Sequence, residues 1–133
     1  MSIRLAEANR AIQAALAKAH NLAVNISVTV CDSDGRLVAF QRMDGALAEA
    51  HLASIGKALV SARSGRPSGD ASIEGSEYFR AATVVGEGAP LIRRPGGLPG
   101  QVEGALGVAG ATDAQDVECA HAGIDAFASS GAP

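Results

Sequence analysis

The stretch "NISVTVCDSDGRLVAFQRM", residues 25–43, decides the fold because the periodicity of the chain changes there from helix to strand. Ile26, Val28 and Val30 alternate with small or polar residues, and this two-residue period is typical of a β-strand. A return strand is expected at residues 37–40. The Asp-Gly of "DSDG" between them favours a tight turn, because glycine tolerates positive φ. The sequence therefore predicts an antiparallel β-hairpin.

Helical patterns lie on both sides of this hairpin. Apolar residues recur every three or four positions from Leu5 to Ala19, with Ser2 as the expected cap and Asn21 as the expected end. A second helix is expected from Ala46 to about residue 62, after the turn at Asp44-Gly45.

The rest of the chain alternates between turn-rich passages and short regular elements. Residues 63–75 are rich in Gly, Ser and Pro and predict an exposed loop. Short strands are expected at Leu91-Ile92 and within residues 102–111, and Thr112 or Asp113 caps a last helix. This order of elements predicts a single α+β domain over residues 1–133 with a mainly antiparallel sheet.

Composition excludes several classes of function. The net charge is −3 and no basic run occurs, so nucleic acid is not an expected partner. No window approaches the roughly 18 apolar residues of a membrane span, and the charged N-terminus is unlike a signal peptide, so we expect a cytoplasmic protein. Aromatic residues make up only 3%, which predicts a core of Ala, Val, Leu and Ile.

The segment "RMDGALAEAHLASIGKA", residues 42–58, concentrates charged residues. At about 100° per residue, one stripe of the predicted helix is apolar. Its members are Ala48, Leu52, Ile55, Leu59 and Ala62. His51 lies on the flank of that stripe, Lys57 on the opposite face and Glu49 to the side, so a local Glu-His-Lys triad is excluded. Asp44 precedes the helix, where an aspartate typically caps the helix or closes the turn.

The three histidines do not have the spacing of a zinc site, so no metal centre is predicted. His121 lies at the edge of the apolar face of the last helix, and His20 at a helix C-terminus. One side chain can serve as an axial haem ligand without any characteristic spacing in the sequence. The commoner role of a single histidine, cysteine, methionine or tyrosine is nevertheless packing or surface polarity. The candidates are His51, His121, Cys31, Cys119, Met43 and Tyr78.

Glycine recurs every third residue in "GALGVAG", residues 104–110, which matches no nucleotide-binding motif. Glycines in a strand indicate the close approach of another backbone, a helix or a flat ligand. The remaining carboxylates and arginines are suited to general acid–base chemistry on a small organic acid. Their spacing in the sequence does not require such a function. They are Asp32, Asp44, Glu87, Glu103, Arg93 and Arg94.

Four segments together resemble one family over nearly the whole chain. "VTVCDSDGRLVAFQRMDGA", "KALVSAR", "PGGLPG" and "GALGVAGATDAQDVECAHAGIDAF" resemble the GlcG/HbpS family of haem-binding or haem-degrading domains, which is similar to the C-terminal domain of PduO. The resemblance implies a profilin-like fold, in which helices flank an antiparallel sheet, and dimers that build larger oligomers. It also implies work on a small molecule without a settled common chemistry, since some relatives bind haem or corrinoid compounds and others are encoded among catabolic genes with no defined reaction. The matching residues are Asp32, Gly35, Arg42, Asp44, Gly45, Lys57, Gly96, Gly97, Pro99, Gly104, Gly107 and Gly110.

Three features depart from the family pattern. Only Gly100–Glu103 separate the "GGLP" turn from "GALGV", where relatives carry a longer segment. Ala109 replaces a serine whose hydroxyl could face a ligand. His51 and His121 lie outside the pattern, which leaves room for an activity of this chain's own.

Two functions follow from these observations. The first is a small-ligand binding homo-oligomer, with haem or another tetrapyrrole as ligand. Its expected ligand-binding residues are Arg42, Lys57, Gly97, Gly107 and His121. The second is a catabolic enzyme that isomerises, hydrates or opens a small carbonyl or carboxylate compound, with Asp44, His51 and Glu103 as acid–base groups and Arg42 orienting the substrate.

Overall fold

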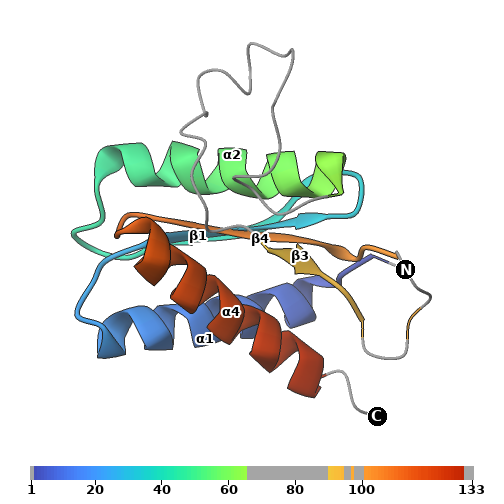
Figure 1. Ribbon diagram of the computed structural model, residues 1–133, viewed down its shortest axis with the longest axis horizontal. Coiled ribbons are helices and arrows are strands. Elements are labelled where there is room, and N and C mark those ends of the chain that lie inside the picture. Colours follow the sequence, from blue (N-terminus) through green and yellow to red (C-terminus); the bar gives the residue numbers. More distant parts are fainter. Residues whose placement is uncertain (1, 66–89, 95–96, 98–100, 131–133) are drawn as a thin grey trace.

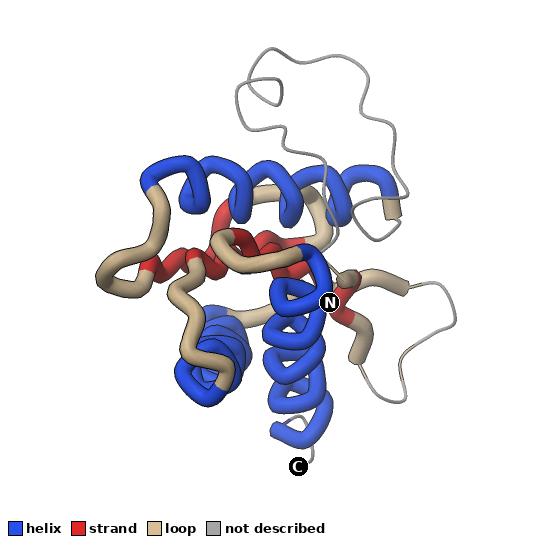
Figure 2. Tube along the Cα trace, turned by 60° about the vertical axis from the view of Figure 1, so that its left-hand side comes forward, coloured by secondary structure: helices blue, strands red, loops and turns tan. Residues whose placement is uncertain are grey.

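The computed structural model describes residues 2–65, 90–94, 97 and 101–130. Within them, three helices flank a four-stranded antiparallel sheet with the order β2-β1-β4-β3. Helix α2 covers one face of the sheet, and α1 and α4 cover the other (Figures 1 and 2). The expected α+β, profilin-like architecture is confirmed. The bounds are α1 Leu5–Asn21, β1 Ser27–Asp32, β2 Leu37–Arg42, α2 Ala48–Ser64, β3 Leu91–Ile92, β4 Gly104–Ala109 and α4 Asp113–Ser130.

The hairpin forms as predicted. Asp32 accepts hydrogen bonds at Oδ1 from the backbone N–H groups of Asp34 and Arg36, both at 2.9 Å, and Gly35 has a φ of +78°. The ladder between β1 and β2 is regular from Ser27 to Val30 and shifts register after that residue. Local turn chemistry is therefore sufficient to place these two strands.

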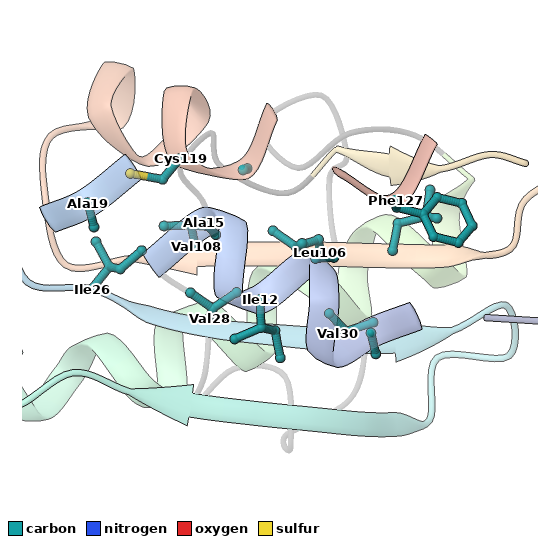
Figure 3. Packing of buried hydrophobic residues seen from close by; sticks show 14 of the residues in the cluster. Ile12, Ala15, Ala19, Ile26, Val28, Val30, Leu106, Val108, Cys119 and Phe127 are labelled. Carbon is teal, nitrogen blue, oxygen red and sulfur yellow. The ribbon is translucent and has the colours of Figure 1, made fainter. Parts of the chain in front are cut away.

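The face of the sheet covered by α1 and α4 carries the larger hydrophobic core. Val28 and Leu106 meet Ile12 of α1 and Phe127 of α4 there, all fully buried (Figure 3). A Cβ atom on Gly123 would lie 2.9 Å from the carbonyl oxygen of α1 residue Ala11. The two helices therefore approach each other more closely than a larger residue at this position would allow.

The predicted apolar stripe of α2 was right at Leu59 and Ala62, which are buried, and wrong at Ala48 and Leu52. Ala48 is exposed and Leu52 is 45% exposed, whereas small and polar residues face the sheet. The cause is Gly107 in β4, where a Cβ would lie only 2.2 Å from the carbonyl oxygen of Ser54. A helix this close leaves room only for small side chains opposite Gly107, such as those of Ser54 and Ala58. The buried residues of α2 are Ala50, Ala53, Ser54, Gly56, Lys57, Ala58, Leu59, Val60, Ser61 and Ala62.

The helix ends confirm one predicted cap and correct another. Thr112 caps α4, because its Oγ1 accepts the backbone N–H of Gln115 at 3.2 Å. Ser2 does not cap α1; its hydroxyl pairs with that of Ser33 at 2.6 Å, and Arg4 holds the cap position. In the part of the chain that the structure describes, no helix is long and apolar enough to cross a membrane. Some residues named above lie outside the described ranges, namely Gly96, Pro99, Gly100, Tyr78, Glu87 and nearly all of the predicted loop at 63–75.

Candidate ligand-binding site

An aromatic ring, a guanidinium and an imidazole come together where β2 passes the N-terminal turns of α2. Phe40 lies directly across the ladder from Thr29, whose Oγ1 pairs with Ser54 of α2 at 2.9 Å, so Phe40 is on the α2 face of the sheet. The rings of Phe40 and His51 meet edge to face, with centroids 6.3 Å apart and planes at 74°. Arg42, two residues on, shares that face and is exposed. We call Phe40, Arg42, Leu47 and His51 the α2/β2 site.

The hydrogen bonding of His51 determines its tautomer. Its Nδ1 lies 2.6 Å from the carbonyl oxygen of Ala48. Because a carbonyl oxygen only accepts, Nδ1 must carry the proton, and the lone pair of the neutral ring is then on Nε2. A histidine that donates its second ring N–H to a backbone carbonyl is the usual arrangement for a metal-ligating imidazole.

Asp44 lies in the turn that joins β2 to α2 and is exposed. It does not cap the helix, because Leu47 holds the N-cap position and α2 has no side-chain cap. Nearby, Arg42 donates from Nη1 to the carbonyl oxygen of Ala46 at 3.4 Å, and Gly45 has a φ of +80°. Asp44 and Arg42 thus flank the junction between β2 and α2, and their predicted roles in a site stay predictions.

Glu103 lies at the other end of β4 and is not brought to the α2/β2 site. It directly precedes Gly104, which pairs with Asp32, and it is nearly fully buried. Arg94 donates from Nε to its Oε1 at 2.8 Å and also holds Glu7 with Nη1 at 2.8 Å and Nη2 at 3.2 Å. The same guanidinium lies over the ring of Phe127, 5.3 Å from its centroid.

The hydrogen bonds from Arg94 lower the pKa of Glu7 from 4.5 to about 2, although burial acts in the opposite direction. The two carboxylates in turn raise the pKa of Arg94. Glu103 therefore belongs to an ion-paired cluster that ties α1 and the segment after β3 to the start of β4. We call Glu7, Arg94 and Glu103 the carboxylate clamp.

Lys57 is buried beneath α2, although the predicted helical face placed it away from the core. Its Nζ donates to the carbonyl oxygen of Val108 at 2.9 Å and forms an ion pair with Oδ2 of Asp116 at 3.2 Å. The other oxygen of Asp116 accepts the N–H of Ala111 at 3.0 Å. Burial raises the pKa of Asp116. This pair connects α2 to β4 and to the first turn of α4.

The other predicted ligand-binding residues are dispersed. Gly107 is buried under α2, where it allows the close approach of the helix. His121 is exposed on α4, on the opposite side of the sheet from α2. Gly97 is exposed and its N–H donates to the carbonyl oxygen of Arg94 in a turn. None of these three adjoins His51 in the described structure.

The sulfur atoms among the axial-ligand candidates are part of the core. Burial raises the pKa of Cys31 to about 12 and that of Cys119 to about 11, so both remain neutral thiols at pH 7. Met43 accepts the backbone N–H of Ile26 at its sulfur, 3.3 Å away. Among the described candidates, His51 combines a defined tautomer with a partly exposed ring.

A buried hydroxyl near this site leads to a prediction about stability. Among the described residues, Ser27 Oγ is buried without a hydrogen-bond partner, and Ala109 lies directly opposite it in the ladder. Ala109→Ser would supply a hydroxyl to pair with Ser27 Oγ. Because pairing a buried polar group is worth about 1 kcal/mol, we expect the free energy of unfolding, measured in urea, to rise by that amount. The matched control is Ala105→Ser, opposite Cys31, which we expect to be destabilising. Equal destabilisation by both changes would contradict the prediction.

Comparison with known proteins gives a consistent result. Residues 3–125 match the model of a family described as haem degrading protein HbpS-like. An uncharacterised 15.0 kDa protein of the dhaT-dhaS intergenic region of Citrobacter freundii is 33% identical, over 95% of this chain and 92% of its own. The crystal structure of Klebsiella pneumoniae ORFY has a TM-score of 0.78 at 26% identity, over 94% and 90% of the two chains. That of a PduOC–haem complex has a TM-score of 0.79 at 21% identity, over 95% of each chain, and shows a shared fold.

Proposed function

Because this chain belongs to the family of HbpS-like haem-degrading proteins, we propose that it is a cytoplasmic homo-oligomer that binds haem or another tetrapyrrole at the α2/β2 site. The 2.6 Å hydrogen bond between His51 Nδ1 and the carbonyl oxygen of Ala48 is the observation on which the proposal rests. The family description and the haem complex of a similarly folded protein support the class of ligand.

The residues around His51 suit the different parts of such a ligand. The exposed guanidinium of Arg42 offers a planar pair of donors for a carboxylate such as a propionate. Leu47, the N-cap residue of α2, is 63% exposed and offers apolar surface at the start of the helix, and Phe40 offers an aromatic ring beside His51. His51 would hold the iron of a bound haem, and the iron would supply redox and small-ligand chemistry there. The hydrogen bond to Ala48 would hold the imidazole in the ligating tautomer.

The alternative, an acid–base enzyme, has less geometric support. Glu103 is held by Arg94 at the far end of β4, whereas Asp44 lies in the exposed turn between β2 and α2 and His51 at the α2/β2 site. A proton-transfer role for the latter two stays a prediction. A catalytic role for Glu103 would require a second copy to bring it to this site.

Titration of the purified protein with haemin tests the proposal. We expect the Soret band to shift and saturate, and His51→Ala to weaken binding by about tenfold or more, because loss of an axial ligand removes a coordinate bond. His20→Ala and His121→Ala are matched controls, since both side chains are exposed elsewhere on the molecule.

Two results would contradict the assignment. A wild-type protein that gives no saturable Soret shift would rule out haem as the ligand. A His121→Ala variant that loses binding while His51→Ala retains it would move the axial ligand to α4. Circular dichroism of each variant confirms that it is folded.

A further inference from the structure

Strand β2 forms an open edge of the sheet. It is the terminal strand in the order β2-β1-β4-β3, and no described segment pairs with its outer side. Met43 donates its N–H inward, to the carbonyl oxygen of Ile26 at 3.0 Å. Along an antiparallel strand, the backbone N–H and C=O groups of successive residues point alternately to one side and the other. The backbone groups of Gln41 therefore also point towards β1, whereas those of Phe40 and Arg42 point away from it.

The sequence of this edge is complementary to itself. If a second copy pairs antiparallel around Gln41, then Phe40 of each copy lies opposite Arg42 of the other. An arginine across from a phenylalanine on one face of a sheet gives a cation–π pair, and no like charges oppose each other. The register shift of the β1–β2 ladder lies beyond Val30, outside the part of β2 that would pair with the second copy. Shifting the pairing by one residue in either direction would no longer place Phe40 opposite Arg42 of the second copy.

From this complementarity we infer that two copies of the chain join through their β2 edges, with Gln41 paired to Gln41 of the second copy. The inference rests on the proposed homo-oligomer and names its interface. It would also extend the α2/β2 site, since each site gains Phe40 and Arg42 of the second copy on its α2 face. Helix α2 lies mainly over β1 and β4, which leaves that face of β2 accessible.

Cysteine cross-linking tests the register. Residues directly opposite in a non-hydrogen-bonded antiparallel pair have Cα atoms about 4.5 Å apart, within the range of a disulfide. We expect Gln41→Cys to form a covalent dimer rapidly when oxidised with diamide. Gln41 is on the α1 face, near Gln13, so this change leaves the α2/β2 site intact. The native cysteines are buried, and the wild-type protein controls for them.

Leu37→Cys is the matched control on the same strand. Leu37 is 56% exposed, but in this register the two copies of residue 37 are more than about 20 Å apart. We therefore expect it to cross-link at least about tenfold more slowly, as collision alone would allow. Sedimentation equilibrium of the wild-type protein should give a multiple of twice the 13.3 kDa chain mass.

Each outcome decides between the alternatives. A monomeric wild-type protein would overturn both the interface and the proposed homo-oligomer. A dimer in which folded Gln41→Cys fails to cross-link, or in which Leu37→Cys reacts as fast, would overturn the interface alone. Should Gln41→Cys fail to fold, a mixture of Phe40→Cys and Arg42→Cys proteins decides the same register. Haem binding is measured separately, so its absence would leave the interface standing.

Discussion

Replacing Arg94 with methionine is expected to lower the free energy of unfolding at pH 7 by about 3–5 kcal/mol, because it removes the cation that two buried carboxylates share and leaves Glu7 paired with the exposed Arg4 alone. The side chains of Glu7 and Glu103 are each 2% exposed, and Arg94 donates to both. Urea unfolding followed by circular dichroism measures the loss. A decrease below about 1 kcal/mol, the value of an exposed ion pair, would show that the carboxylate clamp contributes little.

The acid dependence of stability provides a second measurement of the same clamp. The pKa of Glu7 is lowered from 4.5 to about 2, so its ionised form stabilises the fold at pH values above about 4.5. That contribution, about 3 kcal/mol, is lost as the pH falls from 4.5 towards 2. In Arg94→Met the carboxyl group protonates at higher pH, and the difference in stability between variant and wild type should shrink on acidification.

Two controls separate charge from packing. Arg94→Lys keeps the cation but loses the planar fork, so we expect it to recover only part of the stability. Combining Arg94→Met with Glu7→Gln removes one uncompensated charge and should be more stable than Arg94→Met alone. If the double variant were less stable than Arg94→Met, contacts with Phe127 rather than charge pairing would explain the loss.

Local chemistry in the sequence was sufficient to predict most elements. The Asp-Gly turn at Gly35 placed the hairpin, and Thr112 marked the start of the last helix, because both signals act within a few residues. Each of these features depends on neighbours in the chain.

Features that depend on distant segments could not be predicted in this way. The buried face of α2 is set by Gly107, which lies on another element and admits only small side chains. An alanine-rich helix has apolar residues on several faces, so its period alone is ambiguous. The pairing of Glu103 with Arg94 and Glu7 joins three separate segments, and no spacing in the sequence signals it.

Lys57→Met is the second change expected to have a large effect, about 3–5 kcal/mol, because it leaves Asp116 charged in the core. The side chains of Lys57 and Asp116 are 4% and 3% exposed, and Nζ also satisfies the carbonyl oxygen of Val108. Burial raises the pKa of Asp116, and removing the lysine would strengthen that effect. The stability of the variant should therefore fall further as the pH rises above the ordinary value of 3.8.

A double-mutant cycle with Asp116→Asn distinguishes a structural role for Lys57 from a ligand-binding one. The amide can still accept the N–H of Ala111 without carrying charge, so Lys57→Met/Asp116→Asn should be more stable than Lys57→Met alone. Because Nζ is enclosed between α2 and β4, the folded double variant should bind haemin with the affinity of the wild-type protein. A folded variant that lost haem binding would place Lys57 at the ligand, as its match to the family pattern implied. It would also require α2 to move when the ligand binds.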